Sequence, residues 1–510
     1  MAERITTTIS KQNGGRVLGL FLLFALAIYQ FINAGFSTFA IICLLPLAIP
    51  VVYAVFNWQT ETFWLLIIVN YFLQWVNKLQ MLPHGIPVSL YNEMIEVLLI
   101  GIALVDVRKR YPFDRILNLM FLTVGLWCLF CTLQVLNDTC DLGIDVGGWY
   151  GGARMMAFQI MYAFIVYTLY ISAPERILKY LKIWAILSIF SALWTWKQQH
   201  IGFTPTESAW LQTAGRSTHI LAGGTLIRYF STFNDAACYG IHAAGAAMVF
   251  FVTAITTKIK KDRYFFGIAG IIVTWGMFAS GTRTAIFCMI AGFAVFLVLS
   301  RSVKIIIPSA IVGGFFLAIL IFTDIGNGNQ QIRRMRSAFN KNDASSNVRD
   351  INQEAIRKYI ADAPWGLGLS ASYDNVPANN KYKKLSTIPP DSEYVFIWVH
   401  TGKIGITTFV ILTIIMMAGA CWIVLFRIKN RSLMGVGAGL CGAFASIQIG
   451  GYANQVLMQY PNCLMFYGGL AIVYILPYIE PAWVELEEKR LAAQKEKERI
   501  KLEKKLASRV

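Results

Sequence analysis

Charged residues are scarce in this sequence. Asp, Glu, Lys and Arg make up 14% of its 510 residues, whereas hydrophobic residues make up 56% and the mean hydropathy is +0.55. Soluble globular proteins carry about 25% charged residues, and the apolar residues of this chain gather into runs that are too long for a soluble core. The composition therefore excludes an ordinary soluble protein and predicts one that crosses a membrane several times.

The sequence also lacks the cysteine and histidine patterns of disulfide-rich or metal-binding proteins. Its nine cysteines are scattered, mostly inside apolar runs, and its five histidines show no zinc spacing. The closest cysteines, Cys128 and Cys131, lie in the middle of an apolar run, where ordinary small helix residues are commoner than redox centres. A glycine loop that cradles phosphate is missing as well. We therefore expect neither a metal nor another cofactor, and a soluble nucleotide-activated donor is not indicated.

The apolar runs are the main positive signal. They are long enough to span a membrane as helices and fall near residues 17–34, 36–56, 61–77, 89–106, 116–136, 154–172, 180–197, 236–256, 264–280, 284–300, 303–323, 404–426, 433–450 and 460–479. The first run follows a short basic N-terminus without a convincing cleavage site, which favours an uncleaved signal anchor. The predicted fold is an all-α polytopic membrane protein with about fourteen transmembrane helices.

Short connections between these runs alternate in charge. Clusters of Lys and Arg occupy the connections at 107–115, 173–182, 257–263, 301–304 and 427–431. The connection at 137–152 instead carries Asp138, Asp141 and Asp145. Because cytoplasmic loops collect positive charge, this pattern predicts a cytoplasmic N-terminus and a cytoplasmic C-terminus. It also accounts for the net charge of +17 without nucleic acid as a partner.

One long polar segment, which we call the polar insert (residues 324–403), interrupts the apolar pattern. It contains apolar and aromatic side chains that are typical of a folded segment, among them Trp365, Leu367 and Trp398. We expect it to form an external lid on an integral membrane domain of residues 1–480. Residues 481–510 alternate Glu, Lys and Arg with sparse Leu and Ile, which predicts a charged cytoplasmic helix that is either solvated or binds a membrane surface or partner.

Arginines on the predicted external side are the first candidates for a site. Arg228 precedes the run at 236–256, and Arg283 lies in Ser-Gly-Thr-Arg-Thr-Ala between two runs. A guanidinium at such a mouth usually faces a partner or a wet cavity, although a helix-capping or plain loop arginine needs neither. The planar guanidinium fork fits phosphoryl oxygens. Two such groups that face one cavity would therefore suit a diphosphate.

The polar insert adds basic and acidic candidates. Its basic residues, which either bind an anionic lipid-linked substrate or form an exposed face, are Arg333, Arg334, Arg336 and Arg349. Asp391, Glu393 and Tyr394 follow two prolines near the membrane mouth. Asp391 suits two compatible roles: it can accept a proton from an attacking sugar hydroxyl, and it can be the N-cap of the next helix, with Glu393 in the first turn.

Several of these residues lie in short motifs that occur in a fixed order. The motifs are Arg-Tyr-Phe-Ser-Thr-Phe-Asn-Asp-Ala-Ala-Cys-Tyr-Gly (228–240), Ser-Gly-Thr-Arg-Thr-Ala (280–285), Ser-Ser-Asn-Val-Arg (345–349), Pro-Trp-Gly-Leu-Gly (364–368), Asp-Ser-Glu-Tyr-Val-Phe (391–396) and Gly-Lys-Ile-Gly (402–405). On these motifs, which together cover roughly the half of the chain from 226 to 425, the chain resembles the superfamily of O-antigen ligases and Wzy-type polymerases, which are bacterial envelope glycosyltransferases.

The resemblance implies a metal-independent, inverting glycosyl transfer at the outer, periplasmic face of the bacterial inner membrane. The implied donor is an undecaprenyl-diphosphate-linked oligosaccharide, and the acceptor is a glycan or a lipid-linked molecule. Membrane lipids and other proteins of envelope polysaccharide assembly are the further expected partners. Arg228 and Arg283 match the diphosphate-binding arginines of the family and, with Asp391, are the predicted catalytic residues. The predicted substrate-binding residues are Arg349, Arg334, Arg336, Glu393 and Tyr394.

One departure from the family pattern bears on the reaction. Many ligases carry His-Asn where this chain has Asp391-Ser392, and the nearest histidine, His400, is offset by several residues. We expect Asp391 to replace the histidine as the base or as the group that orients the acceptor. This favours a polymerase over a ligase that transfers glycan to lipid A-core.

A transporter or flippase is the rival class. The number of spans suits it, as do Glu93 and Glu96, which lie on one face of a predicted membrane helix and serve either ion coupling or a structural contact. The large insert and the absence of a visible repeat favour the enzyme. A structural scaffold, the third class, would tolerate the loss of every arginine.

Overall fold

The structure is a computed structural model of the chain. It describes residues 50–79, 88–221, 226–301, 303–328, 330–336 and 344–508, together with Leu22, Ala25, Leu26 and Tyr29. The predicted run at 17–34 and most of the run at 36–56 therefore lie outside the described residues.

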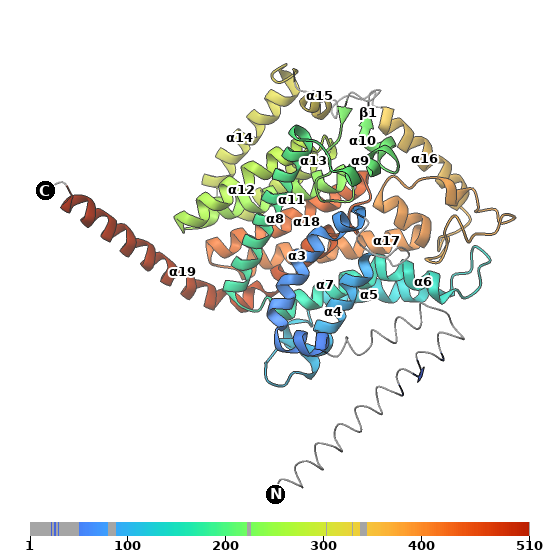
Figure 1. Cartoon of the computed structure of the whole chain (residues 1–510), viewed down its shortest axis with the longest axis horizontal. Coiled ribbons are helices and arrows are strands. Elements are labelled where there is room, and N and C mark those ends of the chain that lie inside the picture. Colours follow the sequence, from blue (N-terminus) through green and yellow to red (C-terminus); the bar gives the residue numbers. More distant parts are fainter. Residues whose placement is uncertain are drawn as a thin grey trace, which may run out of the picture.

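Long helices dominate the described chain (Figure 1). They are α3 (Gln59–Lys78), α4 (Val88–Val105), α5 (Leu119–Leu133), α6 (Val146–Ala153), α7 (Gln159–Tyr170), α8 (Pro174–His200), α11 (Ala236–Thr256), α12 (Lys260–Ala279), α13 (Thr284–Ser300), α14 (Val303–Phe322), α17 (Glu393–Trp422), α18 (Arg431–Ala453) and α19 (Gly468–Ala507). Every predicted run from 61–77 onwards lies on one of these helices or its direct extension, because a chain in lipid must satisfy its backbone hydrogen bonds internally.

Shorter elements lie between these helices. They are α9 (Pro205–Gln212), α10 (Arg216–His219), a two-residue hairpin of β1 (Ile220–Leu221) and β2 (Leu226–Ile227), α15 (Gln330–Arg336), α16 (Ala344–Ile360), and the π-helical turns η3 (Arg154–Phe158), η7 (Ile423–Arg427) and η8 (Cys463–Tyr467). The predicted connection at 137–152 is helical from Val146, where Asp145 caps α6 by accepting a hydrogen bond from the Gly148 amide (2.9 Å).

The fold is all-α and polytopic. Within the described residues, seven helices or continuous helix combinations are long and apolar enough to cross a membrane, or eight if the bent pair Pro50–Asn57 and Gln59–Lys78 forms one span. The predicted total of about fourteen spans and the predicted orientation stay predictions.

Small residues let the central helices approach each other closely. α11 and α18 are buried along nearly their whole length. α13 and α18 cross at Gly292 and Gly442, where a Cβ on Gly292 would lie 3.0 Å from the Gly442 carbonyl oxygen. Ser446 of α18 donates a hydrogen bond to the carbonyl oxygen of Cys288 (2.7 Å). Close backbone packing of this kind is typical of helices that associate in membranes.

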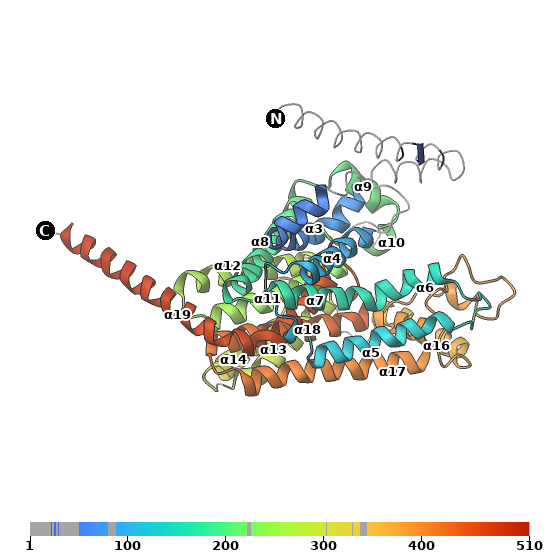
Figure 2. The ribbon, with the colours of Figure 1, turned by 90° about the horizontal axis from the view of Figure 1, so that it is seen from below.

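The two ends of the bundle differ. At one end, where α19 leaves the bundle, Asp262 binds Lys182 (3.3 Å) and Arg490 (2.5 Å), and Lys258 binds Glu487 (2.9 Å). These contacts join two of the basic connections to the charged tail. α6, α9, α10 and α16 lie at the other end (Figures 1 and 2). The basic connections that make these contacts therefore lie far from the polar insert.

The second half of the polar insert packs directly on α17. The Leu367 amide donates to the Val399 carbonyl oxygen (2.9 Å). Gly366 and Gly402 adopt positive φ angles of 76° and 68°, and a Cβ on either one would overlap the backbone of the other segment. Glycine is required at both positions because only it tolerates this conformation and this closeness. The Pro-Trp-Gly-Leu-Gly motif is therefore a turn that fixes the insert to a kink in α17.

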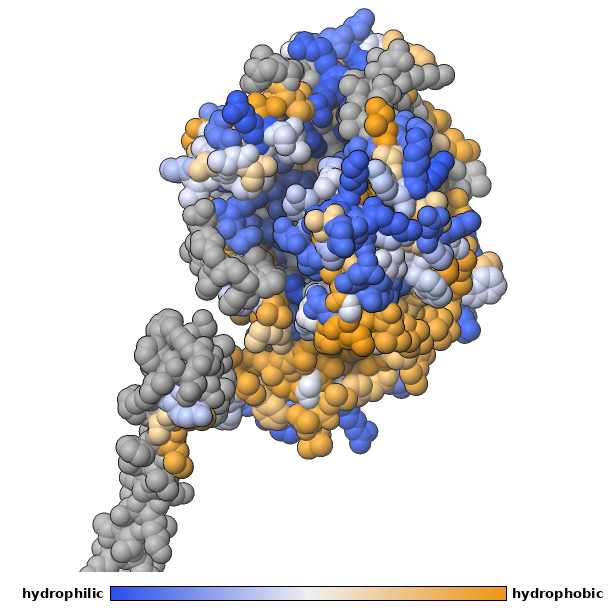
Figure 3. All heavy atoms as spheres, turned by 90° about the vertical axis from the view of Figure 1, so that its right-hand side faces the viewer, coloured by the Kyte–Doolittle hydropathy of each residue, from blue (hydrophilic) through white to orange (hydrophobic). Residues whose placement is uncertain are grey.

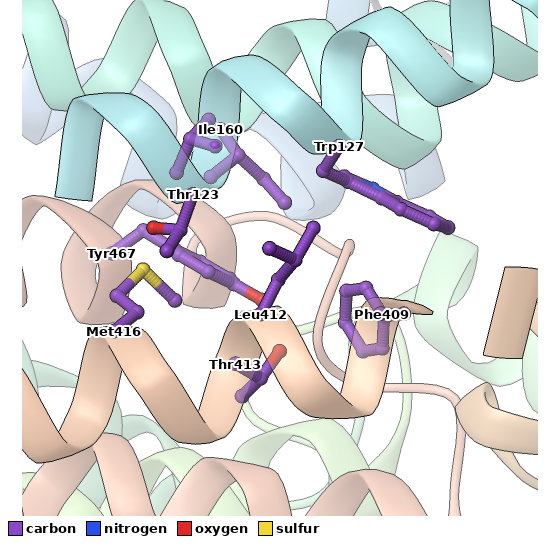
Figure 4. Close-up of a pocket in the computed structure, with 9 residues that line it drawn as sticks. Thr123, Trp127, Ile160, Phe409, Leu412, Thr413, Met416 and Tyr467 are labelled. Atoms are coloured by element: carbon purple, nitrogen blue, oxygen red, sulfur yellow. The ribbon is translucent and has the colours of Figure 1, made fainter. Parts of the chain in front are cut away.

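The end that carries the insert is hydrophilic and hollowed. Figure 3 looks onto this end and shows hydrophilic side chains around a hollow in its upper part, with apolar side chains below. By contrast, a cavity of about 20 Å³ between α5, α7 and α17 is lined mainly by apolar side chains, including Trp127, Ile160, Leu412 and Met416 (Figure 4). It has room for about one water molecule, so we interpret it as a packing gap.

Candidate functional site

Arg228 is held where the β1–β2 hairpin meets the turn between α12 and α13. Its backbone amide donates to the His219 carbonyl oxygen (2.9 Å). Its Nη1 donates to the Thr218 carbonyl oxygen (3.0 Å), and its Nη2 donates to Oγ1 of Thr282 (3.1 Å). The guanidinium is thus fixed in place, and its buried Nε is a donor without a partner among the described residues.

The Ser-Gly-Thr-Arg turn brings a second arginine against Arg228. Arg334 of α15 donates from Nε to the Gly281 carbonyl oxygen (2.9 Å). A Cβ on Gly281 would lie 3.5 Å from Cδ of Arg334 and 3.6 Å from Cγ of Arg228, so the two side chains flank this glycine. Gly281 also has a positive φ of 62°. Glycine therefore lets both arginines approach the backbone of the turn.

Arg283 and Arg349 complete the group. Arg283 directly precedes α13, and Arg349 lies in α16; both are half-buried. Burial lowers the pKa of Arg283, and the charge of Arg349 lowers it further. Burial also lowers the pKa of Arg228. The charge of Asp235 opposes this effect, whereas the charges of Arg283 and Arg349 add to it. The four residues, which we call the arginine cluster, are Arg228, Arg283, Arg334 and Arg349.

The cluster remains positively charged at neutral pH. Burial, together with the charges of Arg228 and Arg283, lowers the pKa of Arg334 to about 10, which is still well above 7. Asp235, the carboxylate beside Arg228, already caps α11 by accepting hydrogen bonds from the amides of Ala237 (2.7 Å) and Cys238 (2.8 Å). The N-terminus of α13 adds the positive end of a helix dipole. Like charges at such close range favour a bound polyanion.

The neighbouring arginines of α15 have other contacts. Nη1 of Arg333 donates to the Asn327 carbonyl oxygen (2.5 Å). Arg336 donates to the Ile325 carbonyl oxygen (3.1 Å) and to the side chain of Asn327. The two bonds of Arg336 hold the turn that precedes α15. They give Arg336 a structural role, and its predicted role in substrate binding stays a prediction.

Asp391 links the polar insert to α17. Its Oδ2 accepts a hydrogen bond from Nδ2 of Asn352 (2.9 Å). Asn352 lies three residues after Arg349 and therefore on the same face of α16. The N-cap of α17 is Ser392, so the alternative in which Asp391 caps this helix is wrong. Its carboxylate instead binds Asn352 of α16, which lies one helical turn from Arg349 of the arginine cluster.

Glu393 and Tyr394 bind other parts of the protein. Glu393 is only 3% exposed, and its Oε2 accepts from the Leu457 amide (2.9 Å). The Tyr394 hydroxyl donates to Oε1 of Gln448 (2.8 Å). Both contacts hold α17 against α18 and the segment that follows it. This geometry gives the two residues a structural role, and contact with substrate stays a prediction.

Glu93 and Glu96 both lie on α4, and Glu93 forms an ion pair. Glu93 binds Arg154 of η3 (2.9 Å), and both side chains are almost fully buried. Glu96 is 1% exposed, and neither of its carboxyl oxygens has a hydrogen-bond partner among the described residues. Because a buried charge requires a partner, we interpret the ion pair of Glu93 as a structural contact. Ion coupling through Glu96 stays untested.

Residues 268–410 match the model of a family described as O-antigen ligase. The match covers 143 of the 510 residues, and we call residues 268–410 the matched region. The match confirms the resemblance to the superfamily of ligases and Wzy-type polymerases. A comparison with curated proteins gives no match. The matched region contains Arg283, Arg334, Arg349 and Asp391, whereas Arg228 lies before it.

Sequence reasoning missed two residues that support Arg228 from outside the matched region. His219 accepts from the Ala236 amide at Nε2 (3.0 Å), and burial, with the charges of Arg228 and Lys78, lowers its pKa to about 3. Lys78 donates to the Phe233 carbonyl oxygen (2.8 Å). Both fix the segment that carries Arg228. A lysine at the end of an apolar run was the one available signal for Lys78; His219 offered none.

Proposed function

We propose that this protein is a membrane glycosyltransferase that polymerises undecaprenyl-diphosphate-linked glycan repeat units at the outer face of the bacterial inner membrane. The arginine cluster carries the proposal. Its four guanidinium groups come from the segment before α11, the turn before α13 and the polar insert, and three of the four lie in the matched region. A lipid-linked diphosphate is the polyanion that fits both this charge and the membrane setting.

The proposed reaction is a single displacement. An acceptor hydroxyl oxygen forms a bond to the anomeric carbon of the donor sugar while the bond from that carbon to the diphosphate oxygen breaks. The electron pair of the broken bond goes to the diphosphate, where the arginine cluster stabilises the growing charge. The hydroxyl proton goes to Asp391. Attack opposite to the leaving group inverts the configuration.

The polar insert supplies the second half of the site. Arg349 and Asn352 are on one face of α16, and Asn352 binds Asp391. We propose that the insert closes over the acceptor and brings its hydroxyl between Asp391 and the diphosphate. Positioning of this kind lowers the barrier by removing the entropy cost of bringing two reactants together.

A ligase that transfers glycan to lipid A-core would use the same donor site. The choice therefore depends on the acceptor, and Asp391 in place of the family histidine favours the polymerase. A transporter would instead depend on the buried Glu96 carboxyl. These alternatives predict different products from the same purified protein.

Reconstitution in lipid vesicles tests the proposal. We expect purified protein to form polymer from lipid-linked repeat units without an ion gradient or added metal. Arg283→Ala should lower transfer at least about a hundredfold, because one charge-stabilising donor contributes that much in other enzymes. Arg333→Ala, on the exposed face of α15, is the control and should leave transfer unchanged. Wild-type rates in Arg283→Ala would remove this residue from the mechanism, and movement of unchanged substrate would support the transporter.

A further inference from the structure

A second cavity lies between the polar insert and α6. Its volume is about 370 Å³, which is within the range of ligand-binding pockets. α6 and η3 form one wall with Gly151, Gly152, Met155 and Met156, which share one helix face. The other walls come from the turn after Pro-Trp-Gly-Leu-Gly, the segment before Pro390, and the first turns of α17.

The lining is mainly apolar, and three of its polar side chains, Ser372, Ser386 and His400, already have hydrogen-bond partners. None of the described lining residues is Asp, Glu, Lys or Arg. The hydroxyl of Ser372 donates to Asn375 (3.0 Å), and that of Ser386 donates to the Lys383 carbonyl oxygen (2.7 Å). A sugar or a phosphate would need several available polar partners. A hydrocarbon chain needs only the apolar walls.

The cavity reaches the surface of a candidate membrane span. α6 begins the apolar stretch Val146–Tyr170. Gly151 is exposed and Met155 is 38% exposed, and both line the cavity. Trp149 and Tyr150 lie directly before them, and such aromatic residues mark the interface between a membrane and water. The cavity therefore opens beside exposed residues near the start of a candidate membrane span.

A short path connects this cavity to the arginine cluster. Pro390 lines the cavity, and the next residue, Asp391, binds Asn352, which is one helical turn from Arg349. We propose that the cavity binds the isoprenoid chain of a lipid-linked substrate. This inference rests on the proposed function, because that function makes both donor and acceptor polyprenyl-linked. The site thus holds a substrate at two points, its charged head at the arginines and its chain beside α6.

Two glycine substitutions on α6 test the site. A Cβ on Gly151 would meet no protein atom within 4 Å, and Gly151 lines the cavity, so Gly151→Leu should place its side chain at the cavity wall. Gly147 is exposed on the same helix and does not line the cavity, which makes Gly147→Leu the matched control. We expect Gly151→Leu to raise KM for the long-chain substrate about tenfold with kcat unchanged. The control variant should match wild type.

Chain length identifies the occupant. In one assay the donor chain is shortened to two isoprene units and the acceptor is full-length. In the other assay the acceptor chain is shortened and the donor is full-length. The substrate whose chain occupies the cavity should lose its sensitivity to Gly151→Leu when it is shortened. If neither shortening removes the effect, or if Gly151→Leu changes nothing, the inference is wrong.

Photolabelling provides a readout that does not need transfer. A polyprenyl diphosphate with a photoreactive chain end should label residues 151–156 or 367–373, and Gly151→Leu should reduce this labelling. A phospholipid with the same group in its acyl chain serves as the comparison. If it labels these residues equally well and excess polyprenyl diphosphate does not compete, the occupant is bilayer lipid and the inference is overturned. Specific labelling in a protein without transferase activity would reject the proposed function alone.

Discussion

Replacing Arg228 by alanine should lower kcat/KM for transfer about 10²–10³-fold, which is the usual effect of removing one preorganised donor that stabilises developing charge. Arg228 is the best fixed member of the cluster, because it is bound to the Thr218 carbonyl oxygen and to Thr282, and its Nε is buried without a partner among the described residues. Steady-state kinetics with a lipid-linked repeat unit measure the effect.

A conservative variant and a control separate catalysis from folding. Arg228→Lys keeps the charge but loses the planar fork, so it should recover only part of the activity. Arg333→Ala removes an exposed arginine from the same end of the protein and should match wild type. Thermal unfolding should show that all three variants are folded. If Arg228→Ala is folded and fully active, the diphosphate is not bound at this cluster.

Asp391→Asn should lower kcat about 10²–10⁴-fold, because the amide cannot accept the proton of the attacking hydroxyl. The amide oxygen can still accept the hydrogen bond from Asn352, so the link between α16 and α17 is kept. The variant therefore removes the proposed proton acceptor without removing the contact. Single-turnover measurements with bound donor report this step directly.

Asn352→Ala is the matched counterpart. It removes the contact with Asp391 but leaves the carboxylate in place. We expect a smaller loss than in Asp391→Asn, mainly in KM for the acceptor, because the insert closes less accurately. Equal losses in both variants would mean that Asp391 only positions the insert and is not the base.

The helices were the most predictable part of the fold. Long apolar runs must form helices in a membrane because the backbone has no other way to satisfy its hydrogen bonds there. The start of α6 was not predicted, because the cap at Asp145 extends a helix into what reads as a polar connection. The sequence also placed the N-cap of α17 one residue too early. The N-cap is Ser392, and Asp391 instead accepts a hydrogen bond from Asn352 of α16.

The candidate site was predictable only in part. Arginines at the predicted outer mouth were visible in the sequence, but three arginines crowd α15 and the sequence does not say which one turns inward. Burial of Met335 decides this, because it sets the face of α15 that packs on the bundle, and Arg334 then reaches Gly281. The cavity beside α6 was not predictable, since its walls come from segments more than 200 residues apart in the chain.

Equilibrium binding of a sugar-free polyprenyl diphosphate to protein in lipid nanodiscs is the most direct test of the central claim. Wild type and Arg333→Ala should bind it equally and should bind the corresponding polyprenol much more weakly. The double variant Arg228→Ala/Arg283→Ala should bind at least about a hundredfold more weakly, because each charge-assisted hydrogen bond contributes about 1.5–3 kcal/mol. Equal affinity of the double variant and wild type would contradict a diphosphate site at the arginine cluster.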